Sequence, residues 1–160
     1  MRFSDFVVRG AIHPTLTAGS KEDVIRELVQ GLVEAGRIDA AEHEAVVETV
    51  LERERLGSTG IGRGVAIPHA KHSSIGELSA AVGVSASGVD FESLDGEPTD
   101  LFFLLVSPPE RSKDHLSVLE YASRQLRNDL FCRLLRQSQS TEDIEQLLQE
   151  ADESSGSAFS

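Results

Sequence analysis

The sequence predicts an α+β protein built as a three-layer α/β/α sandwich, and three observations support this. Leu101–Val106 is an apolar run without a polar face, which is typical of a central strand covered by helices on both sides. Helical patterns fill most of residues 20–57, and further helical segments follow Pro109. Strand-like patterns lie before the first helix and between these two groups of helices. The expected order is strand, two helices, three strands and three helices, with the sheet between helical layers.

The chain length and the charge balance set the first limits on function. With 160 residues, the chain is expected to form one domain over residues 1–150, followed by an acidic, serine-rich tail over residues 151–160 that we expect to be disordered. The 27 acidic and 15 basic side chains give a net charge of −12. This balance argues against nucleic acid or an anionic membrane as the main partner and favours a basic protein.

The cysteine content and the hydropathy bear on the compartment. Cys132 is the only cysteine, so the sequence offers no disulfide framework and no thiolate metal site, as suits a reducing cytoplasm. No apolar run approaches the roughly 18 residues that a membrane span needs, and the N-terminus lacks the apolar stretch of a signal peptide. We therefore expect a soluble cytoplasmic protein without membrane insertion.

The first half of the chain is expected to supply one strand and two helices. Residues 1–10 should hold one short helical turn, and residues 11–16 a short strand that Pro14 places at a sheet edge or a strand end. A capping-box pattern followed by apolar residues at helical spacing predicts a helix over residues 20–36. Similar spacing predicts a second helix over residues 39–57, with basic residues in its last turn.

The second half is expected to complete the sheet and to cover it. Residues 65–67 should form a short strand, and residues 78–87 should pair antiparallel with the central strand. Pro108 and Pro109 end that strand, and Ser112 is the expected N-cap of the next helix. Two more helical segments are expected around residues 130–135 and 144–148.

The stretch Gly57–Lys71 predicts a functional site. It holds four glycines within eight residues, then an apolar run, then a proline that precedes His69. Glycine permits positive φ and close backbone approach, so we expect a loop shaped around a small anion, with Thr59, Gly60, Gly62 and Gly64 as the phosphate-binding residues. A histidine at the end of that loop can act as a nucleophile near neutral pH, although a polar residue at a strand end is the simpler interpretation of an isolated histidine.

Two further side chains are candidates for the same site. His115 follows Ser112 by one helical turn and shares a stripe with apolar residues, so it is either a core histidine or a second active-site histidine near a helix N-terminus. Arg53 stands one helical turn before the glycines and is either a solvated helix end or a guanidinium that grips phosphoryl oxygens.

Two other kinds of site are disfavoured. A dinucleotide fingerprint requires a strand before its glycines and a helix after them, whereas here a helix precedes and a strand follows. A zinc hydrolase built on His69, His72 and His115 would lack any recognisable ligand spacing, so no metal is expected.

Longer segments resemble a known family. Arg53–Lys71 closely resembles the signature of the fructose/mannitol-type enzyme IIA domains of the bacterial phosphoenolpyruvate-dependent phosphotransferase system, most of all the nitrogen-regulatory (PtsN-like) branch. Lys113–Leu116 and Cys132–Arg136 sit where the family has similar segments. The resemblance therefore covers nearly the whole chain, up to about Glu150.

The resemblance implies a mixed parallel and antiparallel sheet between helical layers, and no cofactor. It implies that His69 accepts a phosphoryl group from a histidine phosphocarrier protein of the HPr or NPr kind. It further implies that His115 hydrogen-bonds this group and that Arg53 positions or neutralises it.

We therefore predict a phosphotransferase component with a phosphohistidine intermediate that acts mainly in regulation. Because the sequence shows no IIB or IIC domain, its downstream partner is expected to be a separate IIB, a transporter or a sensor kinase. Two alternatives stay open: a sugar-specific IIA that passes phosphate to a separate IIB, and a regulatory binding protein that docks without transferring phosphate.

Overall fold

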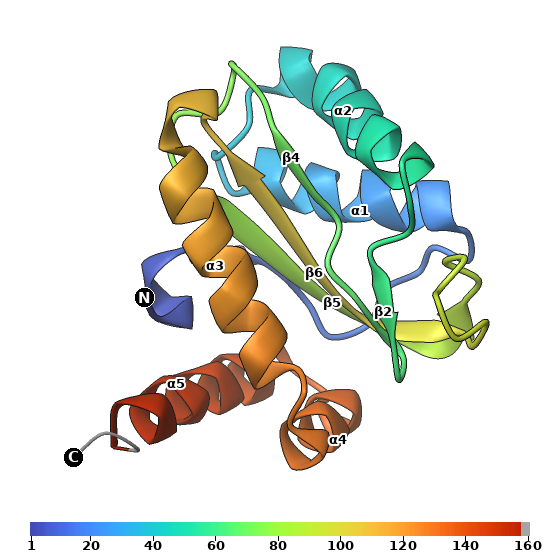
Figure 1. Ribbon diagram of the computed structural model, residues 1–160, viewed down its shortest axis with the longest axis vertical. Helices are drawn as coiled ribbons and strands as arrows, with labels where there is room; N and C mark the ends of the chain where they lie inside the picture. The colour runs from blue at the N-terminus through green and yellow to red at the C-terminus, as the bar shows by residue number, and fades with distance from the viewer. Residues whose placement is uncertain (158–160) are drawn as a thin grey trace.

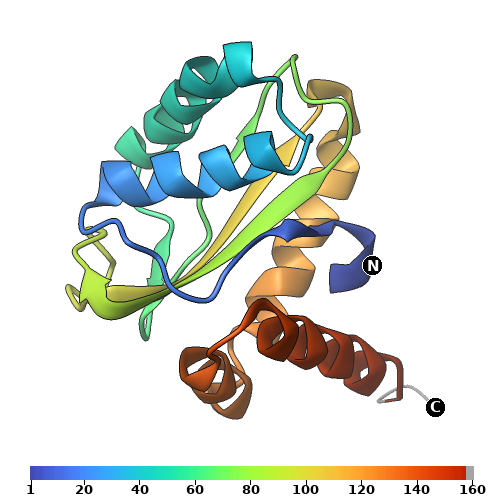
Figure 2. The same ribbon diagram turned by 180° about the vertical axis from the view of Figure 1, so that it is seen from behind.

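The structure is a computed structural model that describes residues 1–157 (Figure 1, Figure 2). Its strands and helices are β1 Val7–His13, α1 Lys21–Glu34, α2 His43–Arg55, β2 Gly60–Gly62, β3 Val65–Ala66, β4 His69–Lys71, β5 Ser79–Val89, β6 Thr99–Ser107, α3 Ser112–Gln125, α4 Asp129–Gln137 and α5 Thr141–Ser157. Short 3₁₀ turns precede β1, α2 and α3. The predicted order is confirmed, with β2, β3 and β4 in the place of the one strand expected at residues 65–67.

The sheet is mixed, as expected. Within the described residues it runs in the order β1-β5-β6-β3-β2, and β4 pairs with β6 further along that strand. β6 is antiparallel to β5 and parallel to β3 and β4, and β1 is parallel to β5. Helices α1 and α2 lie over one face, and α3, α4 and α5 over the other, which confirms the three-layer sandwich (Figure 1, Figure 2). None of the helices in residues 1–157 is long and apolar enough to cross a membrane.

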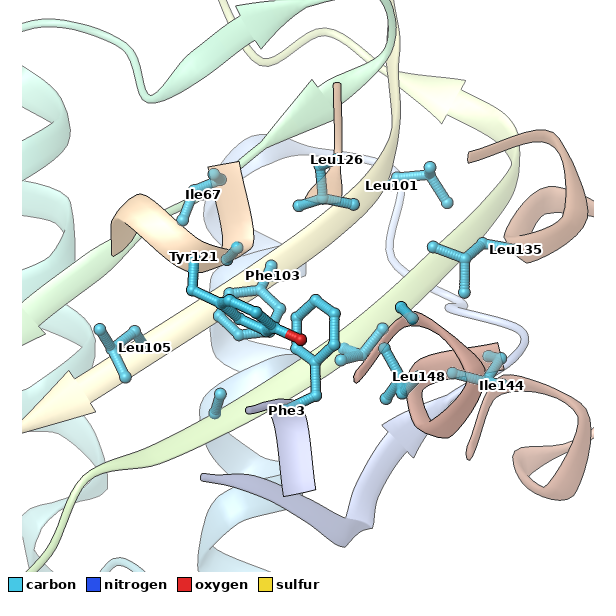
Figure 3. Close-up of a cluster of buried hydrophobic side chains, with 14 of the residues drawn as sticks. Phe3, Ile67, Leu101, Phe103, Leu105, Tyr121, Leu126, Leu135, Ile144 and Leu148 are labelled. Atoms are coloured by element: carbon cyan, nitrogen blue, oxygen red, sulfur yellow. The ribbon is translucent and has the colours of Figure 1, made fainter. Parts of the chain in front are cut away.

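The side chains of β6 alternate between two apolar cores. Within Leu101–Val106, the odd-numbered residues pack with α3, α4, α5 and the N-terminal Phe3 (Figure 3). The even-numbered residues pack with α1 and α2 on the other face. No side chain of this run is more than 3% exposed. The prediction of a central strand with apolar residues on both faces is therefore confirmed, because helices cover both.

Two predicted boundaries are corrected by the structure. β1 begins at Val7 rather than at residue 11 and ends at His13, directly before Pro14, which has no N–H to continue a ladder. The expected edge position is confirmed, since β1 pairs only with β5. Ser112 is not the N-cap of α3 but its first residue, and its hydroxyl donates to the Pro109 carbonyl at 3.0 Å.

The segment expected to be a disordered tail is helical as far as the structure describes it. α5 continues through Ser157, and residues 158–160 lie outside the described residues. The buried carboxylate of Asp152 accepts hydrogen bonds from the Phe3 and Ser4 backbone N–H groups, at 2.7 and 3.2 Å, and from the Tyr121 hydroxyl. These bonds tie the last helix to the N-terminus and to α3. An acidic composition suggests disorder but carries no sign of such long-range partners.

Removing the Asp152 carboxylate is expected to destabilise the fold. An Asp152→Ala change leaves the buried Phe3 N–H and the Tyr121 hydroxyl without their acceptor, at a cost of about 2 kcal/mol in the free energy of unfolding. The neighbouring, exposed Glu153→Ala should change it by less than about 0.5 kcal/mol. Urea unfolding followed by circular dichroism measures both. Equal stability of the two variants would show that the tail is dispensable, as its composition suggests.

Candidate functional site

His69 and His115 meet at one end of the sheet. His69 is the first residue of β4 and lies opposite Leu105 of β6. β6 ends two residues later, and the chain turns through Pro108 and Pro109 into α3, which carries His115 in its first turn. Strand pairing and this short connection together bring the two rings to 5.4 Å between centroids, at 62° to each other. Because β6 pairs with β4 and leads directly into α3, it brings together two histidines that are far apart in the sequence.

The hydrogen bond of His69 determines which ring nitrogen is available. Its Nδ1 lies 2.8 Å from the Ile67 carbonyl oxygen. Because a carbonyl only accepts, Nδ1 carries the proton, and in a neutral ring Nε2 keeps its lone pair. Burial lowers the pKa of His69, and the charge of Arg53 lowers it further, against the opposing effect of the Ile67 hydrogen bond. Burial and the charge of Arg53 both favour the neutral ring, in which Nε2 carries a lone pair that is available for nucleophilic attack.

His115 is a buried partner rather than an exposed one. His115 is only 3% exposed, and its Nδ1 lies 2.6 Å from the hydroxyl of Ser107, the last residue of β6. Burial, together with the positive charge of Lys71 and that of His69 once it is protonated, lowers the pKa of His115 to about 4. When the Ser107 hydroxyl donates to Nδ1, the neutral ring carries its proton on Nε2 and can donate there. Sequence reasoning missed Ser107, a polar residue that ends an apolar strand.

The lowered pKa of His115 predicts a pH-dependent stability. Its folded-state pKa of about 4 lies below the ordinary value of 6.5, so the folded protein binds fewer protons than the unfolded chain between these values. The contribution of His115 to stability is therefore expected to be lost as the pH drops from about 6.5 to about 4. Burial also lowers the pKa of His13 and of His69, which adds to the same slope. An His115→Asn variant should show a flatter slope in urea unfolding at a series of pH values. Parallel slopes for the two proteins would contradict the assignment.

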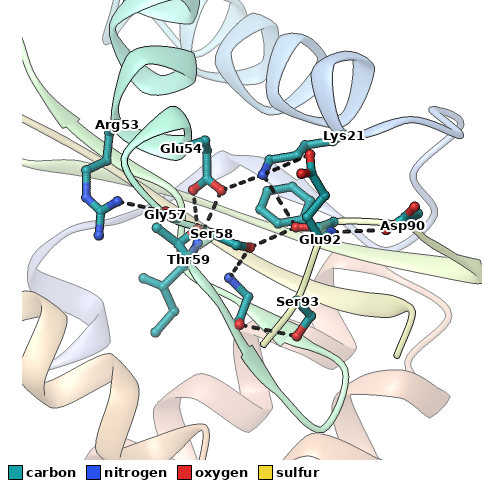
Figure 4. A network of polar contacts seen from close by, with 12 residues as sticks. Lys21, Arg53, Glu54, Gly57, Ser58, Thr59, Asp90, Glu92 and Ser93 are labelled. Atoms are coloured by element: carbon teal, nitrogen blue, oxygen red, sulfur yellow. Dashed lines mark hydrogen bonds and ion pairs between the residues drawn. The ribbon is translucent and has the colours of Figure 1, made fainter. Parts of the chain in front are cut away.

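Arg53 and His69 line the same cavity. This cavity has a volume of about 640 Å³ and lies between the end of α2, the β2–β3 hairpin and α3. The Arg53 guanidinium donates to the Gly57 carbonyl at 2.9 Å, which folds it back over the end of α2 and uses one of its five N–H donors (Figure 4). The structure thus places Arg53 and His69 on one cavity, and His115 next to His69 although His115 does not itself line that cavity. His72 is not among the cavity residues, and its Nδ1 bonds to Ser74.

The glycines form a hairpin rather than an open loop. At its tip, Arg63 and Gly64 have φ values of 58° and 80°, the pattern of a two-residue type I′ turn. A Cβ on Gly60 would stand 3.0 Å from Ser93, and one on Gly64 would stand 2.7 Å from the Asp100 carboxylate. Gly60, Gly62 and Gly64 are therefore needed for the turn and for close packing. None of them lines the cavity.

These positions correct the expected phosphate-binding loop. Asp95 lies beside Gly62, and Gly64 is packed against the ion pair of Asp100 with Arg136, so these side chains fill the space at the hairpin tip. Of the four predicted residues, only Thr59 lines the cavity, and its hydroxyl and N–H both donate to the Glu54 carboxylate.

A buried ion pair holds the start of the hairpin. Glu54, 5% exposed, accepts from the Thr59 N–H at 3.2 Å and from the Thr59 hydroxyl, and pairs with the ammonium of Lys21 at 2.9 Å (Figure 4). Lys21 is the first residue of α1 and also lies 4.7 Å from the centre of the Phe91 ring. The network joins α1, the end of α2 and the hairpin. Sequence reasoning missed it, because nothing in the spacing of Lys21 and Glu54 indicates that they touch.

No metal centre is indicated at the two histidines. Within residues 1–157, no three His, Cys, Asp or Glu side chains are grouped closely enough to hold a metal ion. The cavity offers the imidazole of His69 and the guanidinium of Arg53, and the buried imidazole of His115 lies next to His69. This set suits the acceptance of a dianionic group onto His69 Nε2.

Sequence relatives match over nearly the full chain. A nitrogen regulatory protein of Bradyrhizobium diazoefficiens is 36% identical over 148 residues, which cover 92% of this chain and 95% of that protein. A fructose-specific EIIA component of the phosphotransferase system in Haloferax volcanii is 34% identical over 131 residues, covering 82% of this chain and 84% of that protein.

Solved structures and a family model agree with these relatives. The nitrogen regulatory protein IIA-Ntr of Neisseria meningitidis superposes with a TM-score of 0.83 at 29% identity, over 91% of this chain and 98% of that one. The mannitol IIA of Escherichia coli has the same fold, with a TM-score of 0.72 at 22% identity, over 87% and 96% of the two chains. The model of the family described as "Phosphoenolpyruvate-dependent sugar phosphotransferase system, EIIA 2" matches residues 6–151. With two neutral histidines facing each other in a protein of this fold, the chain belongs to the EIIA 2 family of the phosphoenolpyruvate-dependent sugar phosphotransferase system.

Proposed function

We propose that this protein is a phosphocarrier that accepts a phosphoryl group on His69 Nε2 and acts mainly in regulation, with residues 1–150 as one IIA-like unit. The hydrogen bond from His69 Nδ1 to the Ile67 carbonyl is the observation that carries the proposal. It assigns the ring proton to one nitrogen and leaves the other free to attack. Family membership supports the reaction class, since these proteins are components of a phosphotransferase system.

The transfer is a direct exchange between two imidazoles. The lone pair of His69 Nε2 attacks the phosphorus of a donor phosphohistidine, and a new P–N bond forms as the donor's P–N bond breaks. The electron pair of the broken bond returns to the donor's ring. His69 becomes more positive during attack, and the Ile67 carbonyl on Nδ1–H stabilises that charge.

His115 and Arg53 hold the transferred group. Neutral His115, fixed by Ser107, is expected to donate from Nε2 to a phosphoryl oxygen, and Arg53 to neutralise the negative charge with the N–H groups that Gly57 does not use. Thr59 positions this part of the hairpin through Glu54 instead of binding the group by its hydroxyl.

The proposed donor is a histidine phosphocarrier protein of the HPr or NPr kind in the cytoplasm, and the regulatory role rests on the nitrogen regulatory relative. The fructose-specific relative favours one other candidate function, transfer from His69 to a separate IIB during sugar uptake. Both share the same chemistry at His69. A transporter or a sensor kinase is the proposed partner in the regulatory case.

The test is to determine which atom of the protein carries the transferred phosphoryl group. The protein is mixed with phosphoenolpyruvate, enzyme I and a histidine phosphocarrier, and the product is examined by phosphorus–nitrogen correlated NMR. We expect one acid-labile phosphoryl group, attached to Nε2 of His69. Attachment to Nδ1, or label at another histidine, would overturn the mechanism. Transfer of that label to an added IIB would decide for the sugar-specific candidate.

A further inference from the structure

The cavity at His69 continues as a groove along α3, and this groove has a basic lining in an acidic protein. Its residues on α3 follow one helical stripe, Leu116, Leu119, Glu120, Ser123 and Arg124, which leads to Arg127 beyond the helix. The opposite wall is the hairpin, with Ile61. We call this surface the α3 groove. It consists of Ile61 and of the cavity-lining residues Leu116, Leu119, Glu120, Ser123, Arg124 and Arg127. It carries Arg124 and Arg127 against the single carboxylate of Glu120.

These arginines differ from most cations of the chain because no carboxylate neutralises them. In the described part of the chain, the cations that form ion pairs with carboxylates are Arg9, Lys21, Arg26, Arg37, Arg55, Arg63, Arg111 and Arg136. Arg124 and Arg127 are exposed and have no carboxylate within ion-pair distance in residues 1–157. With a net charge of −12, the chain has acidic side chains in excess, and yet these two remain unpaired.

The two arginines stand at and beyond the C-terminal end of α3, whereas His115 is in its first turn. Arg124 is nine residues after His115, which corresponds to about 13 Å along a helix axis. Between them the groove carries two exposed apolar side chains: Leu116 is 58% exposed, and Ile61 on the facing hairpin is 44% exposed. Exposed apolar side chains flanked by unpaired charges are typical of a protein-binding surface.

We propose that the protein partner that docks over His69 presents acidic side chains around an apolar centre, with the acidic side chains on Arg124 and Arg127. This proposal rests on the proposed function and names the surface chemistry of the partner. It reverses the expectation of a basic partner that follows from net charge, because the local charge at the groove is opposite to that of the whole chain. The apolar centre covers Leu116 and Ile61, and the charges determine which partner is accepted.

The test compares two donors that differ only in charge. A histidine phosphocarrier protein is made with glutamates or with lysines at the same three surface positions around its active histidine, and each form is loaded with phosphate and isolated. Single-turnover transfer is then measured to wild type, to Arg124→Glu/Arg127→Glu, and to Arg133→Glu. Arg133 is an exposed arginine of α4 that does not line the groove, so it is the matched control.

Wild type and the control should accept phosphate from the acidic donor about tenfold faster than from the basic donor at low salt. The double variant should reverse this preference, and both preferences should shrink at high salt, where screening is strong. A wild-type preference for the basic donor, or a double variant that behaves as wild type does, would overturn the proposal. A third outcome would also overturn the proposal. If the double variant accepts phosphate from both donors as wild type does, but no longer binds inorganic phosphate in calorimetry, the arginines form a small-anion site.

A small phosphodonor separates this inference from the proposed function. Phosphoramidate has no docking surface, so it should label His69 equally in wild type, the double variant and the control. If it labels all three but donor preference is absent, the docking proposal fails and the phosphocarrier proposal stands. If neither phosphoramidate nor either protein donor labels wild type, the proposed function itself fails. Melting curves of the double variant establish that it is folded.

Discussion

An His69→Ala variant is expected to accept no phosphoryl group at all from a phosphorylated histidine phosphocarrier. The only ring nitrogen that we assign as the nucleophile, Nε2 of His69, is absent from that variant, and neutral His115 next to it is buried and hydrogen-bonded to Ser107. The loss should be complete rather than partial, because a missing nucleophile has no substitute in the cavity. Acid-labile label after incubation with phosphoenolpyruvate, enzyme I and the phosphocarrier measures the effect.

Two control variants make this result specific. His43→Gln changes a histidine at the start of α2, far from the cavity residues, and should be labelled as wild type is. His115→Asn should still be labelled, but about a hundredfold more slowly, since it keeps the nucleophile but loses the imidazole Nε2–H that the Ser107 contact positions. If His69→Ala takes up as much acid-labile label as wild type does, His69 is not the nucleophile. Equal rates for His115→Asn and wild type would remove His115 from the site.

A Lys21→Met variant is expected to be the most destabilised of the charge-removal variants of this protein. The Glu54 carboxylate is 1% exposed and would lose the one ion-pair partner it has within residues 1–157 while remaining buried. Breaking a buried pair in this way costs about 3 kcal/mol in the free energy of unfolding, more than the pair itself contributes, because the remaining charge is desolvated without compensation. The two hydrogen bonds from Thr59 reduce this loss of stability, but they do not replace the positive charge of the Lys21 ammonium.

The measurement is urea unfolding at neutral pH, with two comparison proteins. Arg55→Met removes the cation of an exposed pair with Glu48 at 2.9 Å and should cost less than about 1 kcal/mol. In the double variant Lys21→Met/Glu54→Gln, the neutral amide can still accept from Thr59, so much of the lost stability should return. If the double variant is no more stable than Lys21→Met, the loss does not come from the unpaired Glu54.

Much of the fold could be predicted because its signals are local. The apolar run at Leu101–Val106 indicates a strand buried on both faces, and the 3.6-residue spacing after Ser20 indicates α1. The predictions that failed concern partners distant in sequence. Asp152 belongs to a segment whose composition is typical of disorder, yet the Phe3 N–H and the Tyr121 hydroxyl hold it in place.

In the candidate site, too, the features with a local signal could be predicted and those that depend on distant residues could not. His69 could be singled out from the sequence, since Pro68 and the preceding glycines mark an unusual turn next to it. The roles of those glycines could not be predicted, because backbone freedom serves a hairpin turn as well as an anion loop. Only the structure shows that Gly60, Gly62 and Gly64 form a hairpin outside the cavity.

By itself, the sequence determined the helix–sheet layers and the family, and it singled out His69 as the candidate nucleophile, because periodicity and a continuous motif are properties of neighbouring residues. The tertiary structure alone decided which nitrogen of His69 is free, that Ser107 fixes His115, that Lys21 neutralises Glu54, and that the groove beside His69 is basic in an acidic chain. Each of these is a contact or a surface shared by segments far apart in the chain. Their proximity comes from the pairing of β4 with β6 and the packing of α1, α2 and α3 around the sheet, and no local pattern encodes it.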